Sequence, residues 1–185
     1  MINDALKDSK ERMEGAIEAL KTDLAGIRTG RATPGLLQGV RVEYYGAMTP
    51  LNQLAAISVP EPQLLTVRPF DPSTVSDIEK AILKSELGLT PNNDGRIIRL
   101  VIPRLTEERR RDLVKVVGRR LEEARVAIRN VRRDILDDLR SFEKEKLISE
   151  DELYRGKDKL QELTDEYIKI VSEIGDRKEK EILEL

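Results

Sequence analysis

The residues with the clearest chemical capacity in this chain are arginines gathered between positions 104 and 133. This stretch holds 11 Lys and Arg residues against 5 Asp and Glu, a net charge of +6. At about 100° per residue, Arg125, Arg129 and Arg132 fall on one flank of a helix, and Arg133 lies nearby. Guanidinium groups donate hydrogen bonds in a fixed fork that matches phosphate oxygens. The spacing therefore predicts a row of phosphate ligands on one rigid helix.

A purely structural role for these arginines is the alternative. The chain from Asp134 to Leu185 holds 10 Lys and Arg residues against 17 Asp and Glu, a net charge of −7. A helix in that acidic part could supply carboxylates for interhelical salt bridges, and Arg119 and Arg120 are the arginines that suit this role best. The overall charge is only −2, so the division of sign along the chain says more about partners than the total does.

The residue types do not favour catalysis. The chain has no His and no Cys, which removes the usual general base, the usual zinc ligands and the reactive thiol. The segment Gly26–Arg31 lacks the spacing of a Walker phosphate loop and follows a helical pattern, so we interpret it as a hinge. Adjacent carboxylates such as Asp137 and Asp138 point apart on a helix. We expect no enzyme, no metal site and no cofactor; a carboxylate metal site among the helices is the enzymatic alternative.

Three segments with helical hydrophobic spacing must position the arginines. The first runs to about Arg28, the second opens at Thr106 and breaks near Leu147, and the third begins with a capping box at Ser149 and Glu152. Each apolar stripe is too narrow to be stable alone in water, so we expect the three helices to pack into one bundle more than about 50 Å long. The seam expected for the third helix is Leu153, Leu160, Leu163, Tyr167, Ile170 and Ile174.

Between the first two helices the pattern changes to strands. Alternating and β-branched residues predict strands at 40–44, 54–59, 64–68 and 97–102. A short helix is expected from about Thr74 to Leu87, with Gly88 just past its end, and Thr90–Gly95 is expected to be a turn. Gly46 and Pro50 are expected to interrupt the chain after the first strand.

The sequence therefore predicts an α+β fold with two domains. Residues 1–29 and 105–185 are expected to form the elongated three-helix bundle, and residues 30–104 an inserted β-rich (β/α/β) domain. Two linkers would join the domains and permit hinge motion. The expected hinge residues are Thr29, Gly30, Arg31, Pro34, Gly35, Pro103, Arg104 and Leu105.

Two further features bear on a nucleic-acid partner. Arg28 and Arg31 flank the first linker, and either could bind RNA, although capping the first helix is the role that the pattern favours for Arg28. The pair Tyr44 and Tyr45 offers too little aromatic surface for a base-stacking platform. Recognition of shape and backbone is therefore favoured over reading of a single-stranded sequence.

The sequence shows no sign of secretion or membrane insertion. No basic segment followed by an apolar run comes after Met1, and no apolar run approaches the roughly 20 residues that span a bilayer. The absence of Cys also removes any disulfide framework. We expect a soluble, cytoplasmic protein.

Several blocks, in order along the whole chain, resemble those of ribosome recycling factors. They are Ile27–Ala32 followed by Pro34, Val42–Gly46 followed by Thr49–Leu51, Leu87–Asn92, Leu105–Arg110 and Val126–Asp134. Each block alone is weakly specific, but together they are highly specific. The sequence departs from the pattern at Ile135, Leu136 and Asp138, which limits how far the basic surface extends.

The resemblance implies an L-shaped molecule whose bundle lies across the RNA of the large ribosomal subunit. The smaller domain would reach toward the small subunit, where elongation factor G acts on it and GTP hydrolysis by that factor drives the subunits apart. Arg129 and Arg132 would be the first RNA contacts, followed by Arg110, Arg133 and Arg28, and Arg125 shares their flank. We expect a monomer without chemistry of its own. A hibernation factor that stabilises joined subunits, and a helical-bundle adaptor for other proteins, remain alternatives.

Overall fold

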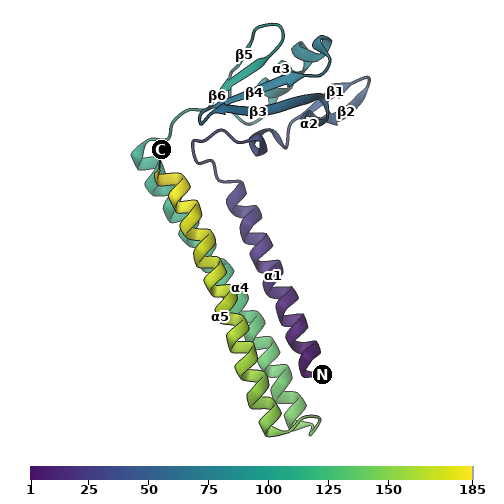
Figure 1. Ribbon diagram of the computed structural model, residues 1–185, viewed down its shortest axis with the longest axis vertical. Helices are drawn as coiled ribbons and strands as arrows, with labels where there is room; N and C mark the ends of the chain where they lie inside the picture. The colour runs from purple at the N-terminus through teal and green to yellow at the C-terminus, as the bar shows by residue number, and fades with distance from the viewer. Residues whose placement is uncertain (185) are drawn as a thin grey trace. The chain divides into compact units, whose positions relative to one another are not determined.

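The computed structural model describes residues 1–184, and its contacts divide the chain into two compact units. One unit consists of Met1–Thr29 together with the chain from Glu107 onward, and the other is Gly30–Thr106. The second boundary therefore falls between Thr106 and Glu107, two residues later than expected. Within the described chain the first unit is helical and the second carries the strands, which confirms the α+β class (Figure 1).

The helical unit is a bundle of α1 (Ile2–Ala25), α4 (Glu107–Lys144) and α5 (Glu150–Leu183), and each helix packs against the other two. Because α4 has 38 residues, it extends about 57 Å at about 1.5 Å per residue. The predicted capping box opens α5: Glu152 N donates to Ser149 Oγ over 3.2 Å, and Ser149 N donates to Glu152 Oε2 over 2.7 Å. The first helix ends at Ala25, three residues before the expected Arg28, with Gly26 as its C-cap.

The apolar stripes of α1 and α4 form most of the bundle core as predicted. Buried residues are Met13, Ile17, Leu20 and Leu24 in α1, and Leu113, Val117, Ala124, Ile128, Val131, Ile135 and Leu139 in α4. For α5 the expected seam is partly wrong, because Leu163, Ile170 and Ile174 are only partly buried. The buried line runs through Leu160, Thr164, Tyr167, Val171 and Gly175. Periodicity of large apolar residues misses this line because Thr and Gly occupy two of its positions.

Polar contacts tie α1 to both of its neighbours. Tyr167 of α5 donates its hydroxyl hydrogen to Glu14 Oε1 over 2.9 Å. Burial of the phenol, and its hydrogen bond to Glu14, raise the pKa of Tyr167 to about 12. Arg12 Nη2 lies 2.7 Å from Asp134 Oδ2 of α4. Helix α1 is therefore linked by one side-chain contact to each of the other two helices.

Helices α4 and α5 pack tightly at Gly175. A Cβ built on Gly175 would lie 2.3 Å from Leu121 Cδ1 and 3.2 Å from Leu121 Cγ, well inside the optimal carbon–carbon separation of about 3.5–4.0 Å. Leu121 therefore packs directly onto the backbone of α5 at this level.

Gly175→Ala should lower the free energy of unfolding by about 1–3 kcal/mol, the usual cost of adding a methyl group to a filled core. Gly118→Ala on α4 is the matched control, because a Cβ there meets nothing within 4 Å. The control should raise stability by up to about 1 kcal/mol, since alanine is the better helix former. Urea unfolding measures both variants. Equal stabilisation by the two substitutions would contradict the close contact at Leu121.

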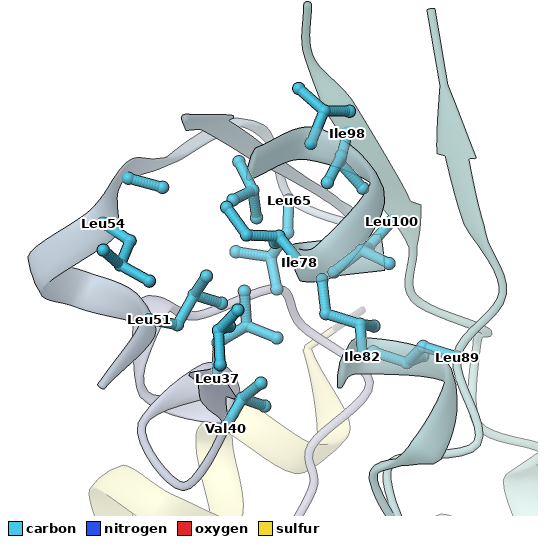
Figure 2. Close-up of a cluster of buried hydrophobic side chains, with 14 of the residues drawn as sticks. Leu37, Val40, Leu51, Leu54, Leu65, Ile78, Ile82, Leu89, Ile98 and Leu100 are labelled. Atoms are coloured by element: carbon cyan, nitrogen blue, oxygen red, sulfur yellow. The ribbon is translucent and has the colours of Figure 1, made fainter. Parts of the chain in front are cut away.

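The second unit contains a two-stranded hairpin, a four-stranded antiparallel sheet and short helices. Its elements are the 3₁₀ helix Pro34–Leu37, β1 (Arg41–Tyr44), β2 (Ala47–Pro50), α2 (Leu51–Leu54), β3 (Ala55–Glu61), β4 (Leu64–Pro69), the 3₁₀ turn Pro72–Thr74, α3 (Val75–Lys84), β5 (Pro91–Asn93) and β6 (Ile98–Val101). The order in the larger sheet is β3-β4-β6-β5. Figure 2 shows its core, where side chains from α3, such as Ile78 and Ile82, meet Leu65 and Leu100 of the sheet.

Five elements of this unit are not predicted from the sequence, namely β2, β5, α2 and the 3₁₀ segments Pro34–Leu37 and Pro72–Thr74. Ala47–Pro50 pairs with β1, and Pro91–Asn93 pairs with β6, so the segment 90–95 is a turn only in part. Both strands are short and carry a proline, which hides them in a pattern search but is tolerated at the edge of a sheet. The four-residue helix Leu51–Leu54 is too short to show periodicity. The helix α3 stops at Lys84 because Ser85 adopts an extended conformation with ψ 155°, before the expected end at Leu87.

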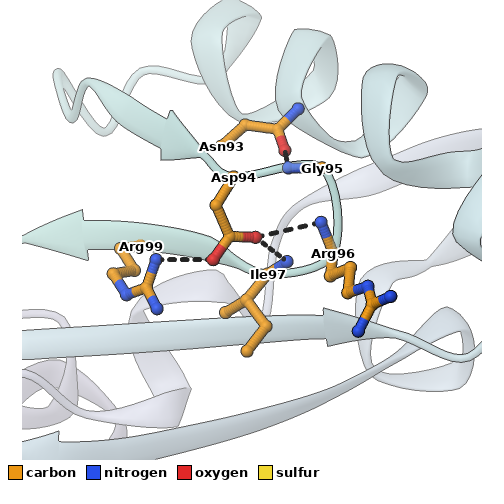
Figure 3. Close-up of polar contacts among 6 residues, drawn as sticks. All are labelled: Asn93, Asp94, Gly95, Arg96, Ile97 and Arg99. Carbon is orange, nitrogen blue, oxygen red and sulfur yellow. Dashed lines mark hydrogen bonds and ion pairs between the residues drawn. The ribbon is translucent and has the colours of Figure 1, made fainter.

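The turn between β5 and β6 is organised by Asp94 (Figure 3). Its Oδ1 accepts hydrogen bonds from Ile97 N over 2.8 Å and Arg96 N over 3.0 Å, and its Oδ2 accepts one from Arg99 Nη1 over 2.9 Å. These donors stabilise the carboxylate and hold the pKa of Asp94 at about 2, below its ordinary 3.8. Gly95 completes the turn with φ +91°.

Acidification should loosen this turn. Because folding depresses the pKa of Asp94, its contribution to stability is present above about pH 3.8 and is lost as the pH falls through about 2. Amide hydrogen exchange at Arg96 and Ile97 should therefore accelerate, relative to an unstructured peptide, in this pH window. Asp94→Asn should remove the pH-dependent part of the protection. Protection that stays constant down to pH 2 would contradict the role of the carboxylate.

Candidate nucleic-acid interface

The buried stripe of α4 determines which way its arginines face. Arg125, Arg129 and Arg132 each directly follow a buried residue of the stripe, namely Ala124, Ile128 and Val131. Each arginine therefore lies about 100° around the helix from the core. The structure brings the three together on one flank of the stripe, as the spacing predicts.

These arginines line one hollow between α4 and α5, which we call the α4–α5 hollow. It has a volume of about 450 Å³. Its lining residues are Arg125, Arg129, Asn130, Arg132, Arg133 and Leu136 of α4, with Gln161, Thr164, Asp165 and Ile168 of α5. Four guanidinium groups thus surround a floor with apolar side chains, and none of the lining residues is aromatic.

The four guanidinium groups are held in two ways. Arg125 Nη1 lies 3.5 Å and Arg129 Nη2 lies 2.9 Å from the carboxylate of Glu122, which the two arginines share. Arg132 donates instead to the side-chain carbonyl of Gln161, and Arg133 donates to Asn130 Oδ1 over 2.5 Å. Two of the four are therefore oriented by neutral amides, and within residues 1–184 neither of these two forms a direct ion pair.

Interhelical salt bridges to α5 are not the role of these arginines. Among residues 1–184, none of the four guanidinium groups of the hollow forms an ion pair with a carboxylate of α5. Arg120 pairs with Glu123 of its own helix over 3.1 Å. Arg133 and Arg129 are exposed, the side chain of Arg129 to 54%, whereas Arg132 and Arg125 are partly buried, the side chain of Arg125 being 28% exposed. In the described chain, the acidic residues do not form a cluster that could hold a metal ion.

The other two predicted RNA contacts lie outside the hollow. Arg110 sits near the start of α4 and is partly buried, and its Nε is enclosed without a hydrogen-bond acceptor. Arg28 is exposed and follows the end of α1 at Ala25. The C-cap residue of that helix is Gly26, and the interpretation of the Arg28 side chain as a helix cap stays a prediction. An RNA contact by Arg110 or Arg28 stays a prediction.

Of the expected hinge residues, Thr29–Arg31 and Pro103–Leu105 lie near the two chain connections between the units, whereas Pro34 and Gly35 do not. Thr29 and Gly30 are buried, and Gly30 has φ +78°. Pro34 and Gly35 belong to a 3₁₀ helix of the second unit. The turn at Pro62 and Gln63 forms hydrogen bonds with the first and the last segment of the second unit. At the first segment, Ala32 N donates to Pro62 O over 2.7 Å. At the last segment, Ile102 N donates to Gln63 O over 2.8 Å, and Arg104 Nε donates to Gln63 Oε1 over 3.0 Å. The chain passes between the units at Thr29–Gly30 and at Thr106–Glu107, next to these hydrogen-bonded positions.

Sequence reasoning missed the contribution of α5 to the hollow. Gln161 and Asp165 are four residues apart, the spacing at which side chains on a helix surface meet, and Gln161 Nε2 donates to Asp165 Oδ1 over 2.8 Å. That spacing was the only signal available. It gives no indication that Gln161 also reaches Arg132, because the rotation of α5 against α4 depends on tertiary packing.

The chain matches the family model described as "Ribosome recycling factor" over residues 20–183. It belongs to the ribosome recycling factor family. Curated relatives named ribosome-recycling factor include one from Natranaerobius thermophilus, 57% identical over 176 residues that cover 95% of this chain and 96% of the relative. Others come from Roseiflexus castenholzii and Carboxydothermus hydrogenoformans, which are 56% and 57% identical and covered, like this chain, over their full length.

Solved structures of the family have the same fold. A solution structure of the ribosome recycling factor matches with a TM-score of 0.80 and 43% identity, covering 100% of this chain and 98% of that one. A second structure matches with a TM-score of 0.67 and 46% identity over 99% of both chains. It contains the T. thermophilus ribosome recycling factor and the E. coli elongation factor G bound to the E. coli post-termination complex. The predicted family is therefore confirmed, and this chain is a translation factor of the ribosome recycling class.

Proposed function

We propose that this protein binds the RNA of the large ribosomal subunit through the arginines of the α4–α5 hollow. We propose further that, together with elongation factor G and GTP, it promotes separation of the subunits after termination. The observation that carries the proposal is a full-length family match combined with four arginines that line one hollow.

The composition of the hollow favours contact with the RNA backbone. Phosphates are recognised by guanidinium forks, whereas unpaired bases are usually stacked on aromatic rings. The hollow supplies four arginines and no aromatic side chain among its lining residues. Binding should therefore depend strongly on salt and weakly on the identity of the bases.

The proposal also covers the partners and the place of action. The protein acts as a monomer on cytoplasmic ribosomes, and its β-containing unit contacts the small subunit. It carries out no chemistry of its own, and the nucleotide hydrolysed is the GTP of elongation factor G. Movement of one unit against the other, about the connections near residues 29–31 and 103–106, would transmit the action of that factor.

Light scattering of post-termination ribosomes tests this function. Addition of the protein with elongation factor G and GTP should lower the scattered intensity as joined subunits separate. Omission of any one of the three components should leave the signal unchanged. A hibernation factor would instead raise or preserve the signal of joined subunits, and a helical-bundle adaptor would not sediment with ribosomes at all. Either result would overturn the proposal.

A further inference from the structure

We infer that Gln161 and Asp165 of α5 are positioning residues for Arg132 of α4. The inference rests on the proposed function, in which Arg132 is a ligand of ribosomal RNA. Arg132 Nη1 donates to Gln161 Oε1, and Gln161 Nε2 donates to Asp165 Oδ1 over 2.8 Å. The three side chains form a relay that starts at a carboxylate on one helix and ends at a guanidinium on the other.

The direction of the relay follows from the hydrogen-bonding capacity of each group. An ionised carboxylate only accepts hydrogen bonds, so Asp165 must face the amide nitrogen of Gln161. The carbonyl oxygen of Gln161 is then the atom left to face α4. A guanidinium only donates, so this oxygen is a matched acceptor for Arg132. Asp165 therefore sets the orientation of the amide, and the amide sets the place of the guanidinium.

The amide in the middle orients Arg132 without pairing it directly with a carboxylate. Arg125 and Arg129 differ in this respect, because they share the carboxylate of Glu122. A phosphate that binds those two must compete with an ion pair. At Arg132 it competes only with a neutral acceptor that occupies one of the five N–H groups of the guanidinium. The guanidinium of Arg132 is thus held in position by Gln161 and still has N–H groups available to bind a phosphate.

The place of the pair in the hollow supports a positioning role. A second hollow of about 230 Å³ lies beside the first and is lined by Lys157, Asp158 and Leu160. Arg132, Leu136 and Gln161 line both hollows. The contact between Arg132 and Gln161 therefore lies where the two hollows adjoin, at the border between α4 and α5.

Asp165→Asn tests the relay through the sign of its effect. Loss of a negative charge beside an RNA-binding surface should strengthen binding if only electrostatics matter. Under the relay, the substituted side chain can offer an N–H of its own to Gln161, the amide of Gln161 can turn over, and Arg132 loses its acceptor. Ribosome binding should then weaken roughly 2- to 13-fold, the net worth of one hydrogen bond. Asp158→Asn is the matched control, because it removes the same charge from the same helix at the neighbouring hollow, and it should leave binding unchanged or tighter.

Gln161→Met provides a second variant, which keeps the length of the side chain but replaces the amide carbonyl by a thioether, a much weaker acceptor. It should weaken binding about as much as Asp165→Asn, and neither change should weaken binding further in an Arg132→Ala background. Arginine side-chain NMR adds a direct readout: the Arg132 Nη groups should rotate slowly in the free wild type and faster in both variants. Thermal unfolding reports any general loss of structure.

The outcomes separate the relay from the proposed function. If Arg132→Ala weakens ribosome binding but Asp165→Asn and Gln161→Met bind as well as the wild type or better, the relay is wrong and the RNA site stands. If Arg132→Ala itself binds ribosomes normally, Arg132 is not a ligand of the RNA, and the positioning role of Gln161 and Asp165 fails together with the proposed RNA site. Loss of binding in both relay variants, with Asp158→Asn unaffected, supports the inference.

Discussion

Arg132→Ala should weaken ribosome binding by roughly 10- to 150-fold while leaving the bundle folded. A hydrogen bond between charged groups is worth about 1.5–3 kcal/mol, and every 1.4 kcal/mol is about a factor of ten in affinity. Arg132 lines the α4–α5 hollow, and its side chain bonds only to Gln161 within residues 1–184. Its removal therefore costs the fold little. Sedimentation with ribosomes measures the binding, and thermal unfolding measures the fold.

A matched control is available on the same helix. Arg140→Ala removes the same charge from α4, but Arg140 is not among the residues that line the hollow, and it pairs with Asp137 over 3.4 Å. It should lower affinity by no more than about threefold, the scale of a surface ion pair. The salt dependence adds a second comparison, because loss of one phosphate contact should reduce the slope of log K against log salt by about one for Arg132→Ala alone. Equal losses of affinity for both variants would mean that ribosome binding depends on the net charge of α4 and not on the arginines of the hollow.

The arginine flank was predictable because it depends on local geometry. Once 107–144 forms a helix, the placement of Arg125, Arg129 and Arg132 relative to the stripe follows from the helical repeat alone. The amide partner of Arg132 was not predictable in the same way. It depends on the rotation of α5, which the contact between Gly175 and Leu121 helps to set, and glycine carries no signal in a hydrophobic pattern.

The β-containing unit shows the same limit. Central strands such as β4 and β6 are recognisable because buried residues alternate along them. The edge strands β2 and β5 have three or four residues and include Pro50 and Pro91. They become strands by pairing with a neighbour, which is a tertiary event. The linkers are a related case, since Pro34 and Gly35 have the composition of a flexible segment but form a 3₁₀ helix in the second unit.

Stiffening a linker should preserve ribosome binding while lowering the rate of subunit splitting. Arg104→Pro is the variant of choice, because Pro103 precedes it and two consecutive prolines restrict the backbone to an extended form. Among residues 1–184, the backbone N–H of Arg104 donates no hydrogen bond that this change would remove. An increase of only about 1.4 kcal/mol in the barrier to movement of the units would slow splitting about tenfold.

Arg104→Ala separates backbone stiffness from loss of the side chain. Both substitutions remove the hydrogen bond from Arg104 Nε to Gln63 Oε1, but only proline restricts the backbone. In the first linker, Gly30 has a φ of +78°, which alanine adopts only at a cost of roughly 1–2 kcal/mol. Gly30→Ala therefore restricts the conformations of this linker, and it should also slow splitting. Sedimentation should show wild-type binding for all three variants, and light scattering with elongation factor G and GTP should show slow splitting for Arg104→Pro and Gly30→Ala only. Splitting at the wild-type rate by Arg104→Pro would mean that the second connection is not where the units move. Release of the bundle from the RNA would then have to depend on a movement elsewhere in the molecule.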